Sequence, residues 1–279
     1  MFGRVPFDRR VLPWVALALI CLAMPGCGGS AAAVSGQSRA EASSEAQPAS
    51  LAEVDATLRS ALRAWQTSDP TLSGRPPAAV LAAAARERAL VHNLSLASPQ
   101  DRARTVATLP APLRHATLAE VAAMRNLRVL TGPSTGQTFH LAQPLPAGEL
   151  LADYRRAEKR FGVPWQVLAA VNLVESAFGR VTNHSSAGAQ GPMQFMPSTW
   201  HAYGMGGDIH SAADAILGAA NYLHTSGSPH DTAQALYAYN PSTRYVAAVL
   251  AYARAMRDDP LGFPILYSWE ASLPSTVKG

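Results

Sequence analysis

The spacing of apolar residues limits the fold of this chain more than any other feature. Along most of the sequence they recur three and four positions apart, which places side chains on one face of an α-helix. The clearest early run consists of Leu51, Val54, Leu58, Leu62 and Trp65. Alternation at every second residue, which a half-buried strand requires, is scarce. The sequence therefore predicts an all-α protein.

Breaks in this periodicity predict how the chain is divided. Residues 27–50 are small, polar and aperiodic, which is typical of a flexible tether. Residues 51–131 predict a bundle of about four helices whose role stays open. Residues 132–148, rich in Gly, Pro, Ser and Thr, are expected to be a linker. Residues 149–279 then predict a second domain of five to seven helices.

The first residues have the pattern of an export signal. Three arginines precede the short apolar run "VLPWVALALICLAM", and small residues follow it. We interpret residues 1–26 as a signal peptide. The segment "AMPGCGGS" resembles a bacterial lipoprotein box, which would make Cys27 the lipidated first residue of the mature protein. Ordinary cleavage near Gly26 is the alternative. The sequence does not decide the export route, but both the lipidated and the simply cleaved protein would lie outside the cytoplasm.

Charge and cysteine content exclude several classes of function. The chain carries a formal net charge of +4, and removal of residues 1–26 leaves 20 basic against 18 acidic residues. No basic run accompanies exposed aromatic residues, so we expect no nucleic-acid partner. The only cysteines are Cys21, inside the apolar run, and Cys27, so a zinc–thiolate site and a redox pair are excluded.

One carboxylate stands on a helix face that should be buried. On a helix over Pro164–Phe178, with Gly179 as its C-terminal cap, Glu175 shares a stripe with the apolar residues Leu168 and Val171. Burial raises the pKa of a carboxyl group, and the negative end of the helix dipole acts in the same direction. A protonated carboxyl at neutral pH suits general acid catalysis. A glutamate paired with a hidden arginine, or one that reaches water, is the structural alternative.

Three motifs carry a resemblance to a known family. "ESAFG" at 175–179 resembles the catalytic glutamate–serine motif of the lytic transglycosylases. "SSAGAQGPMQFMPSTW" at 185–200 resembles their second motif, although Pro192 replaces a leucine-like residue. "ALYAYN" at 235–240 resembles the third. The motifs follow the family's order and spacing over roughly residues 150–258. The resemblance implies a lysozyme-like (goose-type, SLT) helical catalytic domain, preceded here by the small helical bundle.

The resemblance also implies a reaction and a set of site residues. Glu175 would act first as general acid and then as base, cleaving the MurNAc–GlcNAc β-1,4 bond of peptidoglycan and leaving a 1,6-anhydromuramoyl product. No second carboxylate is required, because the substrate supplies its own nucleophile. The resemblance assigns further positions to the saccharide groove or its support: Ser185 or the neighbouring Ser186, Gln194, Met196, Tyr239 and Asn240.

Two other functions stay open. A lysozyme-type hydrolase would need a second carboxylate, and Asp208, in a short Gly-rich loop, is the least explained one. Asp231 is expected to be the N-cap of one helix, and Asp214 to lie in the first turn of another behind Ser211 as its N-cap, where capping and the helix dipole explain it. The other alternative is a non-catalytic wall-binding module that uses residues 51–131. In every case we predict no metal and no cofactor, glycan strands of peptidoglycan as the partner, a membrane contact through a lipid anchor, and a monomer. Endo and exo cleavage stay undistinguished.

Overall fold

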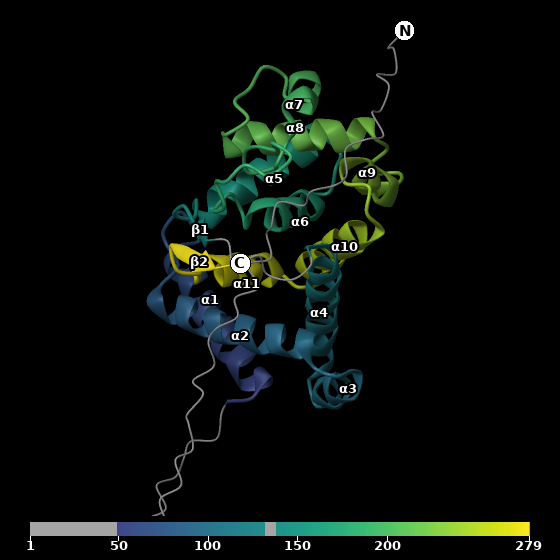
Figure 1. Cartoon of the computed structure of the whole chain (residues 1–279). Helices are drawn as coiled ribbons and strands as arrows, with labels where there is room; N and C mark the ends of the chain where they lie inside the picture. The colour runs from purple at the N-terminus through teal and green to yellow at the C-terminus, as the bar shows by residue number, and fades with distance from the viewer. Residues whose placement is uncertain (1–48, 132–137, 279) are drawn as a thin grey trace, which may run out of the picture.

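A computed structural model describes residues 49–131 and 138–278 of the chain (Figure 1). Within these ranges it contains eleven α-helices and one sheet of two short strands, which confirms the all-α prediction. The predicted signal peptide and Cys27 lie outside the described residues, as does nearly all of the predicted tether. The division of the chain into domains stays a prediction.

The helices follow the chain in two groups. The first group comprises α1 (Leu51–Ser68), α2 (Ala78–Leu96), α3 (Pro99–Ala107) and α4 (Ala111–Thr131). The second comprises α5 (Ala147–Phe161), α6 (Trp165–Ser176), α7 (Pro197–Tyr203), α8 (Ala212–Thr225), α9 (Thr232–Tyr239), α10 (Thr243–Asp258) and α11 (Gly262–Ala271). The strands are β1 (Thr138–His140) and β2 (Thr276–Lys278).

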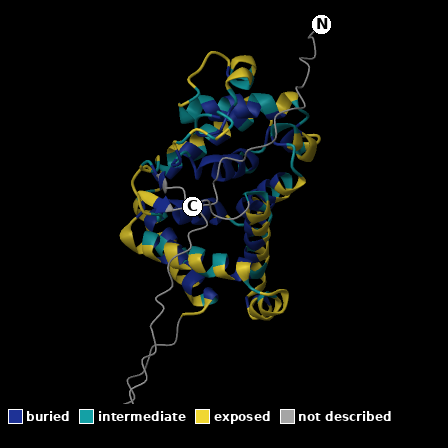
Figure 2. Cartoon of the chain, in the orientation of Figure 1, coloured by how far each residue is buried: buried dark blue, intermediate teal, exposed yellow. Residues whose placement is uncertain are grey.

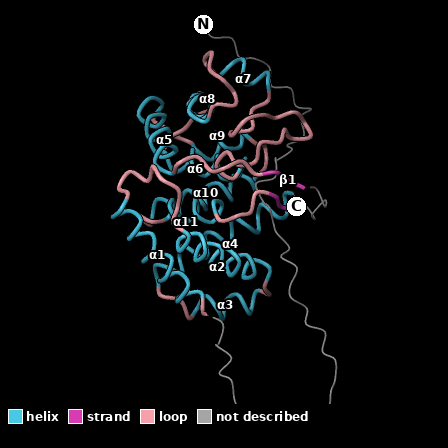
Figure 3. Tube along the Cα trace, turned by 90° about the vertical axis from the view of Figure 1, so that its left-hand side faces the viewer, coloured by secondary structure: helices cyan, strands magenta, loops and turns pink. Residues whose placement is uncertain are grey.

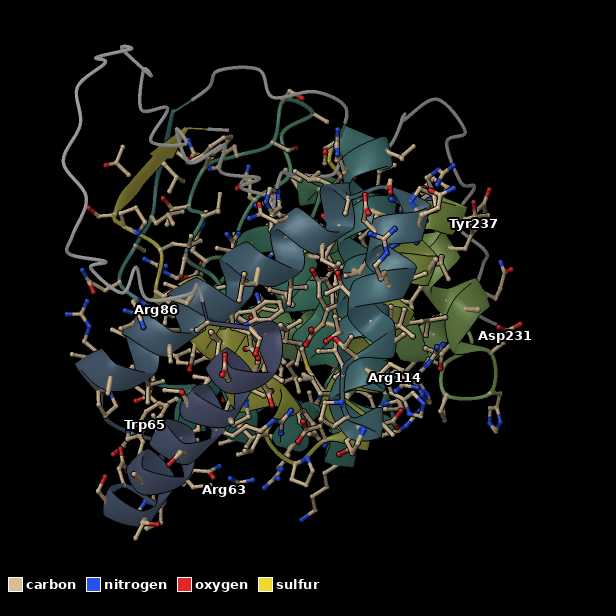
Figure 4. All side chains as sticks on the ribbon, turned by 90° about the horizontal axis from the view of Figure 1, so that it is seen from below. Arg63, Trp65, Arg86, Arg114, Asp231 and Tyr237 are labelled. Carbon is tan, nitrogen blue, oxygen red and sulfur yellow. The ribbon has the colours of Figure 1, made fainter. Side chains whose placement is uncertain are left out.

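Helix α1 illustrates why the first group forms. The Ser50 side chain accepts a hydrogen bond from the backbone of Glu53, and the Glu53 side chain accepts one from the backbone of Ser50, which makes a capping box. All five apolar residues of the predicted stripe are buried. Arg63 lies on the opposite side and is exposed; it projects outward with Arg86 of α2 when the molecule is viewed from below (Figure 4).

Two helices are buried on every side and form the centre of the molecule (Figure 2). In α6 every residue from Val167 to Ser176 is buried, and in α11 all residues are. Helices α5, α8 and α10 pack around α6, while α1 and α2 pack against α11. A single hydrophobic cluster runs from Leu51 in α1 to Ala271 in α11. The first helical group therefore shares the core of the second (Figure 3).

The small sheet was not expected from the sequence. Strand β1, inside the predicted linker, pairs antiparallel with β2, so that Phe139 lies opposite Val277. Both side chains are buried in a separate small cluster with Leu141 and Val181. Three residues a strand are too few to show an alternating pattern, and this is why the sequence did not reveal them. The sheet brings the end of the described chain next to the segment that follows α6.

A group of buried carboxylates lies where α1, α2 and α4 meet the rest of the protein. Asp55, Glu87 and Glu120 are all buried. The indole nitrogen of Trp269 donates to Glu87 at 2.8 Å. Arg59 pairs with Asp55 at 2.8 Å and with Asp259 at 2.6 Å. Burial raises the pKa of Glu87 to about 8, and burial with three like charges nearby raises that of Glu120 well above its usual value.

These shifts predict that stability falls as the pH rises. The folded protein keeps a proton on Glu120 that the unfolded chain releases near pH 4.5, so stability is lost as the pH climbs above that value. We expect the melting temperature to fall between pH 5 and pH 9, and Glu120→Gln to flatten this fall. Calorimetry across the pH range measures it, with Glu149→Gln on α5 as the control. Parallel curves for wild type and Glu120→Gln would contradict the prediction.

Candidate active site

Helix α6 delivers Glu175 to the interior. The helix ends at Ser176 rather than at the predicted Phe178, and Ala177 is its left-handed C-cap at φ 53°. Phe178 and Gly179 continue in the left-handed region at φ 59° and 82°. A non-glycine residue there costs about 1 kcal/mol, and such strain persists only where surrounding contacts impose it. The Phe178 ring is held edge-on against Phe263, with 5.7 Å between ring centroids.

The amide of Asn172 ties α6 to the second motif. It accepts a hydrogen bond from the Tyr154 hydroxyl at 2.6 Å and donates one to the carbonyl oxygen of Pro192 at 2.8 Å. The Ser176 hydroxyl donates to the same carbonyl. All of these groups are buried. Because the Pro192 backbone makes these contacts, the exchange of a leucine-like side chain for proline leaves the link intact.

The irregular second motif folds into a tight turn. Gln190 and Phe195 exchange two backbone hydrogen bonds of 2.9 Å each. Gly191 takes φ 72° at a point where a Cβ atom would lie 1.9 Å from the carbonyl oxygen of Ile209, so no other residue fits there. The apolar side chains Met193 and Phe195 are buried. The missing charge and the many breakers of this stretch thus reflect a buried turn beside α6.

The surroundings of Glu175, called the Glu175 pocket below, bury its carboxyl group and provide one polar partner among the described residues. Its side chain is only 4% exposed, and the Tyr245 hydroxyl donates a hydrogen bond to its Oε1 at 2.8 Å. Burial raises the pKa of Glu175 to about 8, and the hydrogen bond from Tyr245 opposes this rise. No charged side chain of the described residues contributes to the shift. Glu175 is therefore a neutral acid at pH 7, and its Oε2 is free to hold the proton.

Aromatic side chains form the wall next to this pocket. The Tyr239 hydroxyl donates to the carbonyl of Met193 at 2.6 Å, which connects the third motif to the second. Its ring meets Phe195 and Tyr222 edge-on at centroid distances of 5.9 and 5.5 Å. Burial and the nearby Glu175 raise the pKa of Tyr239 well above its usual value. Tyr239 therefore lies close to Glu175 as a neutral phenol.

Two residues of the predicted site hold unpaired acceptors. Gln194 and Asn240 are both buried, and within the described residues neither Gln194 Oε1 nor Asn240 Oδ1 accepts a hydrogen bond. Gln194 takes φ 49° and donates through its amide nitrogen to the carbonyl of Gly191 at 2.9 Å. A buried acceptor without a donor costs about 1–3 kcal/mol. Oxygens held in this way are suited to accept from hydroxyl or amide groups of a ligand.

The two candidate serines differ in surroundings. Ser185 is half-buried, and its hydroxyl accepts a hydrogen bond from the backbone of Ala189 at 2.9 Å, closing the turn that leads into the second motif. Ser186 is exposed. Met196 is half-buried and precedes α7 as its N-cap residue. The structure therefore gives Ser185 a hydrogen bond within the turn, and it shows no side-chain hydrogen bond of Ser186 among the described residues.

The other carboxylates lie apart from Glu175. Asp208 is exposed, and its side chain accepts a hydrogen bond from the backbone of His210 at 2.9 Å. Asp231 is confirmed as the N-cap of α9, where it accepts from the backbone of Gln234. Asp214 lies in the first turn of α8, behind the capping Ser211. No hydrogen bond or ion pair joins any of these three carboxylates to Glu175.

Comparison with protein families identifies the second helical group. Residues 154–261 match the family model described as "Transglycosylase SLT domain". The chain carries a transglycosylase SLT domain. Such a domain implies glycosidic-bond cleavage in peptidoglycan, as the three motifs suggest. The match covers Glu175, the buried turn and α7 to α10, while α1 to α4 and α11 lie outside it. Searches of curated proteins and of solved structures returned no significant match.

The sequence did not reveal the residue that contacts Glu175 directly. Tyr245 lies within the SLT domain, five residues beyond the third motif, in "NPSTRYV", and was assigned no role. It occupies the buried face of α10 with Ala248, Val249 and Tyr252. A tyrosine on a buried helix face needs a hydrogen-bond partner for its hydroxyl, and this requirement could have pointed to Tyr245 as a contact of a buried polar group.

The described residues show neither a metal centre nor a membrane span. Within the ranges 49–131 and 138–278, no three His, Cys, Asp or Glu side chains are grouped so that they could hold a metal ion. No helix in these ranges combines the length and the apolar character needed to cross a bilayer.

The raised pKa of Glu175 predicts that this residue destabilises the SLT domain. The folded state holds a proton that the unfolded chain releases near pH 4.5, so stability declines from there toward pH 8. Glu175→Gln removes this penalty and keeps an acceptor for Tyr245. At pH 7 we expect a gain of about 3 kcal/mol, or about 9 °C in melting temperature. Glu158→Gln on α5 is the control, and an unchanged or lower melting temperature would refute the prediction.

Proposed function

We propose that the protein is an exported lytic transglycosylase that cleaves the MurNAc–GlcNAc β-1,4 bond of peptidoglycan. The observation that carries the proposal is the single buried carboxyl of Glu175, neutral at pH 7 and without a charged neighbour, inside an SLT domain. A second carboxylate at the site would favour hydrolysis by a pair of acids. Glu175 has none among its contacts.

In this proposal Glu175 transfers a proton in each of two steps. Its Oε2 first donates a proton to the glycosidic oxygen, and the bond from that oxygen to C1 of the muramic sugar breaks. The N-acetyl group of that sugar stabilises the positive charge on the ring. The Glu175 carboxylate then removes the proton of the C6 hydroxyl, whose oxygen closes onto C1. The product is a 1,6-anhydro sugar, and Glu175 is protonated again.

The surroundings of Glu175 support both steps. An acid with a pKa of about 8 is protonated before the first step, and once ionised it is a strong base in an apolar pocket. Tyr245 donates to the carboxylate and limits the cost of its charge. Tyr239 keeps Met193 and the second motif beside the pocket. The unpaired oxygens of Gln194 and Asn240 offer acceptors for sugar hydroxyl or amide groups, and we assign Ser185 and Met196 to the edge of the saccharide groove.

Export and anchoring complete the proposal. Peptidoglycan lies outside the cytoplasmic membrane, so an enzyme that cleaves it must be exported. The basic start, the apolar run and Cys27 support secretion followed by lipidation, and residues 28–50 would then link the helices to the membrane.

The mass of the products tests the reaction. Soluble protein lacking residues 1–27, incubated with peptidoglycan, should release muropeptides one water lighter than those of a hydrolase. Glu175→Gln should lower the rate about a thousandfold, because it removes the only group placed to transfer protons. Asp208→Asn is the control and should leave the rate unchanged. Hydrolytic products and loss of activity in Asp208→Asn would favour the hydrolase, whereas wall lysis that persists in Glu175→Gln would refute an enzymatic role for this site.

The dependence of activity on pH provides a separate test. The first step needs protonated Glu175, so kcat/KM should fall about tenfold per pH unit above a pH of about 8. Tyr245→Phe removes the hydrogen bond that lowers this pKa, and the falling limb should move to higher pH while kcat decreases. Tyr237→Phe, exposed on α9 (Figure 4), is the control. An alkaline limb at the same pH in Tyr245→Phe would contradict the assignment.

A further inference from the structure

A groove outside the Glu175 pocket runs between α3, α4 and α10. Its volume is about 310 Å³, and α4 provides most of its lining. Helix α4 extends from the neighbourhood of α3 to α10 (Figure 1). The lining residues that matter here are Arg102, Leu118, Arg125, Asn126, Val129 and Arg244. The groove thus joins the helices that precede the SLT domain to a helix of the domain itself.

Three arginines from three different helices face this groove without an acidic partner. Arg102 donates to the carbonyl of Ala97 at 2.9 Å and Arg125 to that of Ser95 at 3.2 Å. Arg244 donates to the Asn126 side chain at 3.4 Å. None of the three forms an ion pair within the described residues. Neutral acceptors orient these guanidinium groups and leave their charge uncompensated, which is the arrangement that suits an anionic ligand.

Apolar side chains line the groove together with the arginines. Leu118 and Val129 are 44% and 60% exposed. They stand eleven residues apart on α4, which corresponds to roughly 16 Å along the helix. Exposed apolar residues grouped in this way within a recess are typical of binding sites. A ligand that matches the groove is therefore extended and carries small apolar groups between several negative charges.

The groove reaches α10, the helix that also carries the hydrogen-bond donor to Glu175. Arg244 is the direct neighbour of Tyr245, which holds Glu175, and α10 packs against both α4 and α6. Positive charge is also concentrated in the first helical group, which provides most of the groove. Residues 51–131 contain ten arginines, no lysine and six acidic residues, two of which, Glu87 and Glu120, are buried with raised pKa values. The first helical group therefore presents cationic surface at the edge of the SLT domain.

We propose that this groove binds the anionic peptide stem of the peptidoglycan strand whose glycan lies at Glu175. The inference rests on the proposed function, because that function supplies a substrate with a short peptide on each muramic sugar. Such stems combine alanine methyl groups with free carboxylates, which matches the exposed apolar side chains and the arginines. A recess between helices fits an extended chain better than it fits the plane of a bilayer. The first helical group would then select strands that carry peptides.

The test compares two substrates in the soluble protein. One is intact peptidoglycan, and the other is the same glycan freed of its peptides by an amidase. Val129→Glu adds a negative charge to the rim at an exposed position, and Arg102→Glu reverses one of the charges. Each should raise KM for the intact wall about fivefold to tenfold, leave kcat unchanged and leave the peptide-free glycan unaffected. Arg104→Glu is the matched control, since it is exposed on α3 and does not line the groove.

A binding measurement separates this inference from the proposed function. A free stem tetrapeptide with its carboxylates intact should bind Glu175→Gln protein by calorimetry, and Val129→Glu should abolish that binding. If the wild type cleaves neither substrate but binds the tetrapeptide, the proposed activity fails and the groove assignment stands. Cleavage by wild type without tetrapeptide binding overturns the groove assignment. An equal loss of activity on both substrates in Val129→Glu or Arg102→Glu overturns it as well. Loss of binding to phosphatidylglycerol vesicles in Val129→Glu, with tetrapeptide binding intact, would assign the groove to the membrane instead.

Discussion

The burial of the Glu175 carboxyl group is the constraint on which the rest of the site depends. A carboxylate with no counter-ion is too costly in an apolar pocket, so the group keeps its proton at neutral pH. Among the residues that the structure describes, the Tyr245 hydroxyl is the polar group that contacts it, at 2.8 Å. A single hydrogen bond from a neutral donor leaves the pKa raised, whereas an arginine in that place would lower it. The raised pKa of the site thus follows from burial, and the neutral hydroxyl of Tyr245 offsets only part of it.

That neighbour has its own structural requirements. Tyr245 lies in the first turn of α10, which Ser242 caps, and α10 packs against α4 on one side and α6 on the other. The helices that precede the SLT domain therefore support the element that carries Tyr245. On the opposite side, Asn172 and Ser176 hold the carbonyl of Pro192, and Tyr239 holds that of Met193. The contacts of Asn172 and Ser176 are buried, and that of Tyr239 is partly buried.

The backbone around the site carries strain in two places. Ala177 and Phe178 follow Glu175 in left-handed conformations, and Gln194 takes one in the facing turn. Each conformation is unfavourable for a residue with a side chain, and each occurs where two segments are locked together. The close approach of Gly191 to Ile209 and the edge-on packing of Phe178 on Phe263 provide the compensating contacts. The proposed peptide groove lies outside this locked region, on surface that α4 and α10 leave open.

Parts of this arrangement could be predicted from local patterns. Helical spacing places Glu175 on a stripe of apolar residues, and that stripe is buried. The cap at Asp231 is confirmed because it depends on one side chain and the backbone next to it. Helix α11 could not be predicted from apolar periodicity, because a helix that is buried on every side has no polar face with which its apolar residues alternate. The end of α6 was misplaced because Gly179 is the usual signal, whereas Phe178 is drawn out of the helix by ring packing with Phe263, far along the chain.

The sequence by itself determined the helical class, the carboxyl that must be buried and the three motifs that accompany it, since each depends on residues close together in the chain. The tertiary structure alone decided that Tyr245 contacts Glu175, 70 residues away, and that Pro192 serves through its backbone. It alone brought Arg102, Arg125 and Arg244 from three helices to one groove. Contacts of this kind depend on how buried helices pack against one another, and no local spacing encodes that packing.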